Sequence, residues 1–215
     1  KKDRFFDYSV IEPWTELLIE TGAKIILRRK KFIDEFRPYF REVYSKVSSG
    51  REKVNIEYLP DNIPKGLPDS SYKYDDIISI YKKLADDLQK DERNRGTTLF
   101  GPQKDEVAIR INSGIAREIA SQGQHKTLLI SIKFAEFNFL KNIRQETPVI
   151  LLDDIFSELD EERSKTALDM VMDANAQTFV TITNPGVIRS FLPPSENCMY
   201  FRVEEGDVIP VEEVN

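Results

Sequence analysis

Residue types that carry much of protein chemistry are scarce in this sequence. Its 215 residues include a single cysteine, Cys198, and a single histidine, His125, so an internal disulfide and an ordinary structural zinc site are both excluded. Catalysis by a pair of histidines is excluded for the same reason. The apolar runs are also far too short to span a bilayer. These absences predict a soluble protein of a reducing compartment, the cytoplasm.

Charged and apolar residues, by contrast, are plentiful. Lysine and arginine number 31 against 37 aspartate and glutamate, which gives a formal net charge of −6, and 40% of the residues are hydrophobic. Such proportions support a folded core and argue against a disordered chain. The negative net charge argues against a uniformly basic nucleic-acid-coating protein, although it is compatible with a local basic strip.

The first part of the chain has the pattern of long helices. From Trp14 to Tyr44 apolar residues recur at spacings near three and four, which predicts an amphipathic helix. Pro38 lies inside the pattern, so one kinked helix and two shorter pieces are equally expected. A half-buried strand over 54–58 and a second amphipathic helix from Asp75 follow.

Four consecutive basic residues lie within the first predicted helix: Arg28, Arg29, Lys30 and Lys31. They could contact DNA phosphates, and binding of that kind would fall steeply with salt. The alternative is a solvated helix face whose charge Asp34 and Glu35 neutralise. The sequence leaves both interpretations open.

Beyond Arg95 the pattern changes to short apolar runs separated by turn residues, which predicts strands alternating with helices. We therefore expect a helical arm domain with a small sheet over 1–95 and an α/β domain over 96–215. The run 148–153 lacks polar alternation, as is typical of a parallel strand covered on both faces. The other predicted elements are a strand over 107–111, helices over 127–143 and 161–174, a strand over 178–183 and a hairpin around Gly206.

Two carboxylates end the apolar run at Asp153 and Asp154. The C-terminal end of a parallel strand is where ligands of open α/β sheets bind. Asp153 could hold Mg²⁺, directly or through water, because hard cations take oxygen ligands. Asp154 could orient or deprotonate a water that attacks a phosphate. In the alternative interpretation, Asp154 caps the next helix.

A second motif, Ser121-Gln122-Gly123-Gln124, directly precedes the helix that is predicted to start near Lys126. Backbone amides at a helix N-terminus point at an anion, the helix dipole favours negative charge, and glycine permits close approach of a phosphate. The alternative is an ordinary serine N-cap next to a turn glycine.

Taken together, these motifs resemble one family. The Ser121 motif, a helix, a buried strand ending in two acids, and then Ser157-Glu158-Leu159-Asp160 follow the order found in ATPases of the ABC type. With the segment Gly-Pro-Gln-Lys-Asp-Glu over 101–106 and the arm over 14–44, the chain is similar to the RecF family of DNA replication and repair proteins, which are related to SMC heads. The resemblance implies an α/β fold in which a helical arm joins the C-terminal half of an ABC-type, P-loop NTPase head.

The resemblance also implies roles for the two motifs. Ser121, Gly123 and Gln124 would form the signature motif, which reaches across a dimer to the γ-phosphate held by the other subunit. Asp153 would be the Walker B acid associated with Mg²⁺. Asp154 would occupy the catalytic position that is Glu in most ABC enzymes, and because its side chain is one methylene shorter, slow turnover is expected.

The segments that follow would contribute to the dimer interface and to the phosphate site. Ser157 and Asp160 would belong to the D-loop, which lies at the interface. Thr183 would stand where many ABC enzymes carry a switch histidine, and a threonine can hydrogen-bond a phosphate but cannot shuttle a proton. Gln103 and Lys104 depart from the family pattern Gly-Pro-His-Arg-Asp, which puts a bidentate arginine role there in doubt.

One family motif is missing. The sequence contains no Gly-x-x-x-x-Gly-Lys followed by Ser or Thr, the Walker A loop that cradles the β- and γ-phosphates. We therefore expect a fragment that neither binds nor hydrolyses ATP alone. By resemblance, the intact protein would use ATP and Mg²⁺, dimerise on binding ATP, and act with RecO and RecR at double-stranded DNA and single-strand gap junctions in recombination, repair and the SOS response.

Two alternatives stay open. The first is another SMC-related ATPase, such as an overcoming-lysogenisation-defect nuclease, although no separate cluster of carboxylates points to nuclease chemistry. The second is a non-catalytic adaptor whose arm binds a repair partner such as RecR.

Overall fold

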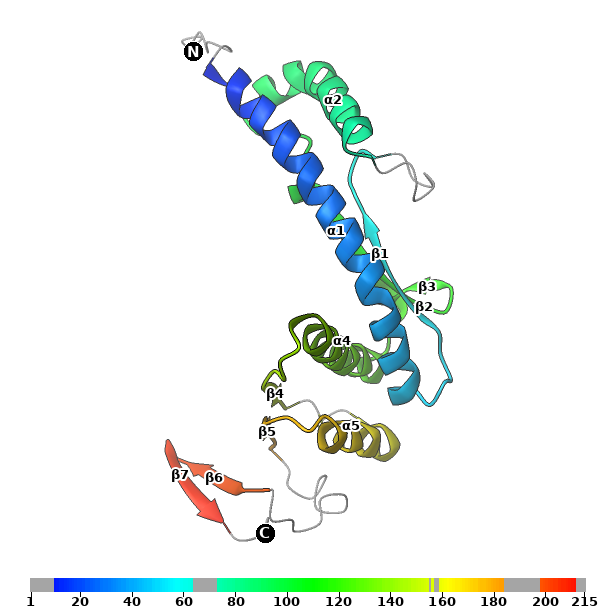
Figure 1. Cartoon of the computed structure of the whole chain (residues 1–215), viewed down its shortest axis with the longest axis vertical. Helices are drawn as coiled ribbons and strands as arrows, with labels where there is room; N and C mark the ends of the chain where they lie inside the picture. Colours follow the sequence, from blue (N-terminus) through cyan, green and yellow to red (C-terminus); the bar gives the residue numbers. More distant parts are fainter. Residues whose placement is uncertain (1–9, 64–72, 155, 157–158, 184–197, 212–215) are drawn as a thin grey trace. The chain divides into compact units, whose positions relative to one another are not determined.

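A computed structural model describes residues 10–63, 73–154, 156, 159–183 and 198–211. Its helices and strands, labelled in Figure 1, are α1 Glu12–Val47, β1 Val54–Leu59, α2 Tyr74–Arg95, the 3₁₀ turn η3 Pro102–Lys104, β2 Glu106–Ile111, β3 Gly114–Ile115, α3 Ala116–Ile119, α4 Gln122–Arg144, β4 Ile150–Asp153, α5 Glu161–Asp173, β5 Thr178–Thr181, β6 Tyr200–Glu204 and β7 Asp207–Val211. No helix among these described residues is long and apolar enough to cross a membrane.

The chain forms two compact units, and each is discontinuous in sequence. Unit 1 contains residues 1–37 and 56–109, and unit 2 contains residues 38–55 and 110–215. The division passes through α1 and through the sheet β1-β2-β3. The domain boundary expected near Arg95 stays a prediction.

Helix α1 is continuous from Glu12 to Val47, with Pro38 inside it (Figure 1). Of the two expected alternatives, the structure therefore has one helix. Buried apolar residues lie on both sides of the proline, among them Phe36 and Phe40, so tertiary packing holds the helical turns that flank the missing backbone donor. The helix ends in a turn over 48–50.

In unit 1, Gly22 of α1 lies against a buried aromatic side chain of α2. A Cβ atom added to Gly22 would lie 2.8 Å from Tyr81 Cε2 and 3.2 Å from Pro102 Cδ. Tyr81 is fully buried and packs edge-to-face on Phe100, with 5.3 Å between ring centroids. The helix continues through Gly22, whose missing side chain allows the close approach of α2 and η3.

A buried carboxylate joins the other elements of unit 1. Asp105, which follows η3, has a side chain that is 1% exposed. Arg29 of α1 donates to its Oδ2 at 3.0 Å, the hydroxyl of Tyr58 in β1 also donates to Oδ2, and the backbone N–H of Asp61 donates to Oδ1 at 3.0 Å. Burial and the hydrogen bond to Asp105 raise the pKa of Tyr58. Asp105 thereby connects α1, β1 and the loop after β1.

Unit 2 contains a parallel pair of strands. β4 pairs with β5 in the register Ile150↔Thr178 to Asp153↔Thr181. The parallel pairing agrees with the prediction, but burial on both faces is wrong for the described residues: Ile150 and Leu152 are buried, whereas Leu151 is 69% exposed. Its register partner Phe179 in β5 is exposed as well, so one face of this sheet, which has two strands within the part of the chain that the structure describes, is left uncovered.

Helix α4 begins at Gln122, earlier than the predicted start near Lys126. Its buried residues include Leu128, Ala135 and Phe139, whereas Ile143, in the last turn, is exposed. Tyr39 of α1 packs edge-to-face on Phe139 at 5.5 Å.

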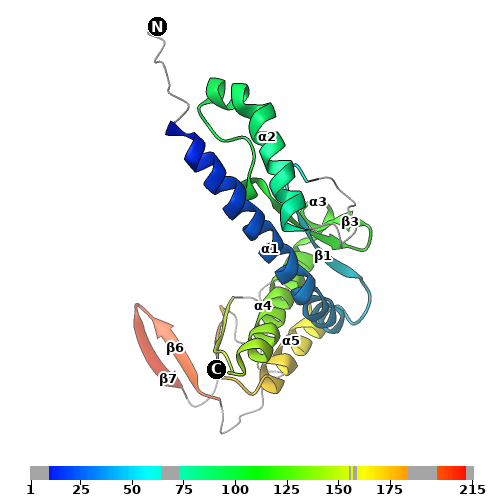
Figure 2. The same cartoon turned by 45° about the horizontal axis from the view of Figure 1, so that its top comes forward.

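Helices α4 and α5 lie next to each other in unit 2 (Figures 1 and 2), and Lys141 Nζ donates to the carbonyl oxygen of Ala174 at 3.1 Å. β6 and β7 form the hairpin that was predicted around Gly206.

Candidate nucleotide-binding site

The two acids lie where the parallel strand ends. Asp153 is the last residue of β4, and Asp154 follows with φ +45°, a left-handed conformation that aspartate tolerates better than most residues. Asp153 is exposed and Asp154 is half-buried. The capping alternative for Asp154 is wrong, because Asp160 is the N-cap of the next helix, α5.

A threonine of the neighbouring strand contacts both acids. The Thr181 hydroxyl donates to Asp153 Oδ1. The backbone N–H of Asp154 points at Thr181, 3.2 Å from its carbonyl oxygen and 3.1 Å from its Oγ1. Thr183 Oγ1 makes a long contact of 3.5 Å with Asp154 Oδ1. Thr181 therefore fixes the backbone at the strand exit and the orientation of the Asp153 carboxylate.

The donors at this exit suit Mg²⁺. Asp153 Oδ1 accepts a hydrogen bond from the Thr181 hydroxyl. The other carboxylate oxygen, Oδ2, is the kind of ligand that a hard cation such as Mg²⁺ binds. Mg²⁺ in phosphate-binding sites is commonly held by one or two carboxylates together with water and substrate phosphates. The described residues contain no group of three or more His, Cys, Asp or Glu side chains that could hold a metal ion.

The Ser121 motif forms the N-terminus of α4. Ser121 is the N-cap and is exposed. Its Oγ accepts from the backbone N–H of Gln124 at 3.2 Å, and Gln124 Oε1 accepts from the backbone N–H of Ser121 at 2.8 Å, which is a capping box. The N-cap alternative is thus correct locally, and it is compatible with anion binding.

The capping box decides which groups of this turn are left for a ligand. It uses the backbone donors of Ser121 and Gln124, so the first-turn amides of Gln122 and Gly123 are those without a partner inside the helix. Because Ser121 Oγ accepts a hydrogen bond, its hydroxyl proton can still be donated. The Gln124 side chain is used within the protein: its Nε2 donates to Glu52 Oε1 at 2.6 Å.

The segment predicted as the D-loop is described only in part. Ser157 lies outside the described residues. Asp160 is exposed and caps α5 by accepting from the backbone N–H of Arg163 at 2.8 Å, and its Oδ2 lies 3.6 Å from the Arg163 guanidinium. His125, the fourth residue of α4, is exposed at the surface.

The basic residues of α1 mostly have acidic neighbours. Arg29 pairs with Asp105 at 3.0 Å, Lys30 with Asp34 at 2.7 Å and Lys31 with Glu35 at 3.7 Å. Arg28 is exposed. These ion pairs favour the neutralised face, and a DNA contact by Arg28, Arg29, Lys30 and Lys31 stays a prediction.

Three residues important to these contacts were not assigned a role from the sequence: Asp105, Thr181 and Glu52. Thr181 could have been found, because parallel pairing places it opposite Asp153. For Asp105 and Glu52 no local pattern existed, since their partners lie far away along the chain.

Known proteins resemble the chain over most of its length. It is 37% identical to the DNA replication and repair protein RecF of Salinibacter ruber over 180 residues, which are 82% of this chain and 42% of the relative. A solved structure of the recombination mediator protein RecF-ATPrS in the RecFOR pathway superposes with a TM-score of 0.76 at 26% identity, covering 98% of this chain and 53% of that one. No family model matches.

The fold is shared more widely. A solved structure from the SMC ATPases, 13% identical, has a TM-score of 0.51 and covers 86% of this chain and 89% of that one, so it matches in fold alone. The α/β fold is thus that of part of an ABC-type ATPase head, as the motifs predicted. The chain spans about half the length of the curated RecF relatives it matches. Motif order, sequence identity and fold all agree, and the chain belongs to the RecF family of DNA replication and repair proteins.

Proposed function

We propose that this chain supplies the signature, Walker B and D-loop segments of an ATP-dependent DNA-binding repair protein of the RecF type. The observation that carries the proposal is that the exposed N-terminus of α4 and the acidic exit of β4 are present in one compact unit. The first can bind phosphate in a partner subunit, and the second can bind Mg²⁺ and a nucleophilic water.

In this proposal Ser121 and the amide of Gly123 contact the γ-phosphate held by the other subunit, and Gln124 keeps their turn in shape. Asp153 would hold Mg²⁺, which when bound offsets the negative charge of the phosphates. Thr181 orients the Asp153 carboxylate, and Thr183 contributes a further hydroxyl near Asp154.

Asp154 would accept a proton from, or orient, the attacking water. Its left-handed backbone, fixed by two contacts from its N–H to Thr181, sets where the short side chain points. Because aspartate reaches less far than the glutamate of most ABC enzymes, slow hydrolysis is expected. Slow turnover suits a protein that acts as an ATP-driven dimer on DNA.

The partners belong to the same proposal. By family, the dimer would act on double-stranded DNA and single-strand gap junctions together with RecO and RecR in the cytoplasm. Asp160 and Ser157 would lie at the ATP-dependent dimer interface, where an exposed N-cap carboxylate such as Asp160 can contact the partner subunit.

Asp154→Asn, in a protein that carries this chain together with a Walker A segment, tests the catalytic role. We expect ATP turnover to fall about 100-fold or more, since the amide cannot accept a proton, while ATP-driven dimerisation persists. Asp154→Glu should retain turnover or increase it. Asp169→Asn, an exposed aspartate of α5, is the matched control and should leave turnover unchanged. Equal turnover in Asp154→Asn and wild type would favour an adaptor instead.

A further inference from the structure

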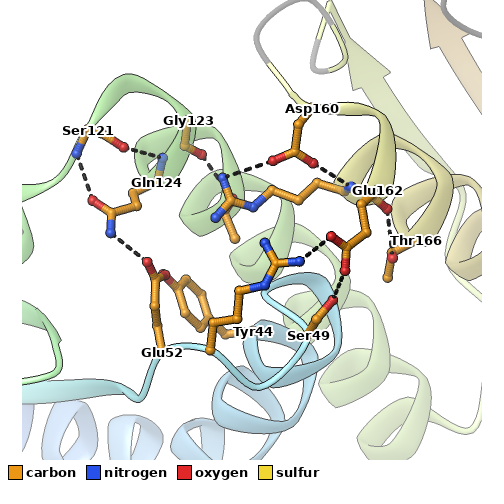
Figure 3. A network of polar contacts seen from close by, with 12 residues as sticks. Tyr44, Ser49, Glu52, Ser121, Gly123, Gln124, Asp160, Glu162 and Thr166 are labelled. Carbon is orange, nitrogen blue, oxygen red and sulfur yellow. Dashed lines mark hydrogen bonds and ion pairs between the residues drawn. The ribbon is translucent and has the colours of Figure 1, made fainter.

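A polar cluster in unit 2 surrounds Glu52, in the segment that follows α1 (Figure 3). Glu52 Oε1 accepts from Gln124 Nε2 at 2.6 Å, and Oε2 accepts from the Tyr44 hydroxyl at 2.5 Å. Both carboxylate oxygens are thus used, one toward the start of α4 and one toward the end of α1. Tyr44 itself is fully buried, so it holds Glu52 from a fixed position.

The carboxylate of Glu52 is charged. Burial alone would raise its pKa, but the hydrogen bonds from Tyr44 and Gln124 and the positive charges of Arg163 and Arg51 outweigh burial and lower the pKa below its ordinary value. Burial and the bond to Glu52 raise the pKa of Tyr44, so the tyrosine keeps its proton and donates it. Glu52 therefore acts at neutral pH as a charged acceptor with two donors.

Glu52 also decides how the amide of Gln124 is oriented. Only the nitrogen of that amide can donate to a carboxylate, so the oxygen must face the other way, toward the backbone N–H of Ser121. The capping box and the Glu52 contact thus share one side chain. Without Glu52, the Gln124 amide can rotate, and Ser121 loses part of what fixes its backbone.

The same segment contacts the start of α5. Ser49 Oγ donates to Glu162 Oε1 at 2.6 Å, and the Arg51 guanidinium pairs with Glu162 Oε2. Glu162 is the second residue of α5, two positions after the N-cap Asp160 (Figure 3). Ser49, Arg51 and Glu52 therefore contact the first turns of α4 and α5, which adjoin the proposed signature and D-loop segments.

We propose that Glu52 is a positioning residue of the ATP-dependent dimer interface. It holds the Ser121 turn of α4 through Gln124, while its neighbours Ser49 and Arg51 hold the start of α5 through Glu162. These contacts fix the N-termini of α4 and α5 relative to each other, so that both can bind at the triphosphate held by the partner subunit. This inference rests on the function proposed above, because it concerns how the same phosphate-facing turn is presented.

Glu52→Gln, in the protein that carries this chain together with a Walker A segment, is the main test. The variant keeps the shape of the side chain but loses its charge. Only the amide oxygen can still accept a hydrogen bond, so the donors Tyr44 and Gln124 no longer both have an acceptor. ATPγS-driven dimerisation, followed by sedimentation, should weaken about tenfold, in line with loss of one charged hydrogen bond. ATPγS binding by the monomer should keep its affinity, because the signature turn acts on nucleotide in the other subunit.

Glu42→Gln is the matched control, since Glu42 lies in the last turns of α1, ten positions before Glu52, and forms an exposed ion pair with Lys46 at 2.8 Å. It should dimerise like the wild type. If Glu52→Gln also dimerises like the wild type, the positioning role is wrong. If it loses monomer affinity and dimerisation together, Glu52 merely supports the fold. If the wild type itself fails to dimerise with ATPγS, the proposed function fails, and this inference fails with it.

A reciprocal exchange tests the contact itself in the 215-residue chain. Gln124→Glu keeps an acceptor for the Ser121 N–H but places a carboxylate against Glu52, so stability to denaturant should fall. In the double variant Gln124→Glu with Glu52→Gln, the amide at position 52 can donate to the carboxylate at position 124. This reversed hydrogen bond should recover most of the lost stability. Additive losses in the double variant would overturn the assignment of Glu52 as the partner of Gln124. Stability is the readout because a carboxylate in place of the Gln124 amide would also repel a phosphate.

Discussion

The two units use aspartate in opposite ways. In unit 1, the Asp105 carboxylate is 1% exposed and accepts from Arg29, Tyr58 and Asp61. In unit 2, Asp153 is exposed at a strand exit, with a threonine hydroxyl as its described partner.

In the sequence, no local pattern shows how many hydrogen-bond donors the carboxylate of Asp105 or of Asp153 will meet. What separates them is how many donors the fold directs at each carboxylate. An acid whose oxygens are saturated by its own protein stabilises the fold, and one with unused lone pairs can bind a cation or a water.

Asp105→Ala should give the largest effect on stability. It leaves a guanidinium, a buried tyrosine hydroxyl and a backbone N–H without their acceptor, so the free energy of unfolding should fall by about 3 kcal/mol. Asp153→Ala removes an equal side chain from an exposed site and should change stability by only about 0.5 kcal/mol. Urea unfolding of both variants measures the difference, and equal losses would break the comparison.

Gly22→Ala should have the next largest effect. Alanine favours a helix by about 1 kcal/mol, but the added methyl would collide with the buried ring of Tyr81, and overpacking costs about 1–3 kcal/mol. We expect a net loss of up to about 2 kcal/mol by the same measurement. Thr21→Ala, at the exposed neighbouring position, should be neutral or slightly stabilising. A stabilised Gly22→Ala variant would show that α2 can move away from α1.

Acid should weaken unit 2 partly through Glu52. Because the folded-state pKa of Glu52 lies below its ordinary value of 4.5, its contribution is present above that value and is lost as the pH falls through the folded pKa. Wild type should therefore lose more stability between about pH 6 and about pH 3 than Glu52→Gln. The effect is the smallest of the three because Glu52 is only half-buried. Parallel pH profiles for the two proteins would contradict it.

Local patterns were enough for most of the fold. Alternating burial in Val54–Leu59, the hairpin around Gly206 and the parallel pairing of β4 follow from short stretches of sequence. At Pro38 local preference left one helix and two pieces equally open, and the structure has one helix. The start of α4 was predicted several residues too late, because the helix begins directly after its Ser121 cap.

For the site, the sequence by itself determined which chemical groups stand at the strand exit and at the helix N-terminus, because each depends on neighbours within a few residues. Only the tertiary structure decided which acids are saturated and which side chains hold the site in place. Glu52 lies 72 positions from Gln124, and Arg29 lies 76 positions from Asp105. Contacts over such separations depend on the path of the whole chain, and no local periodicity encodes them.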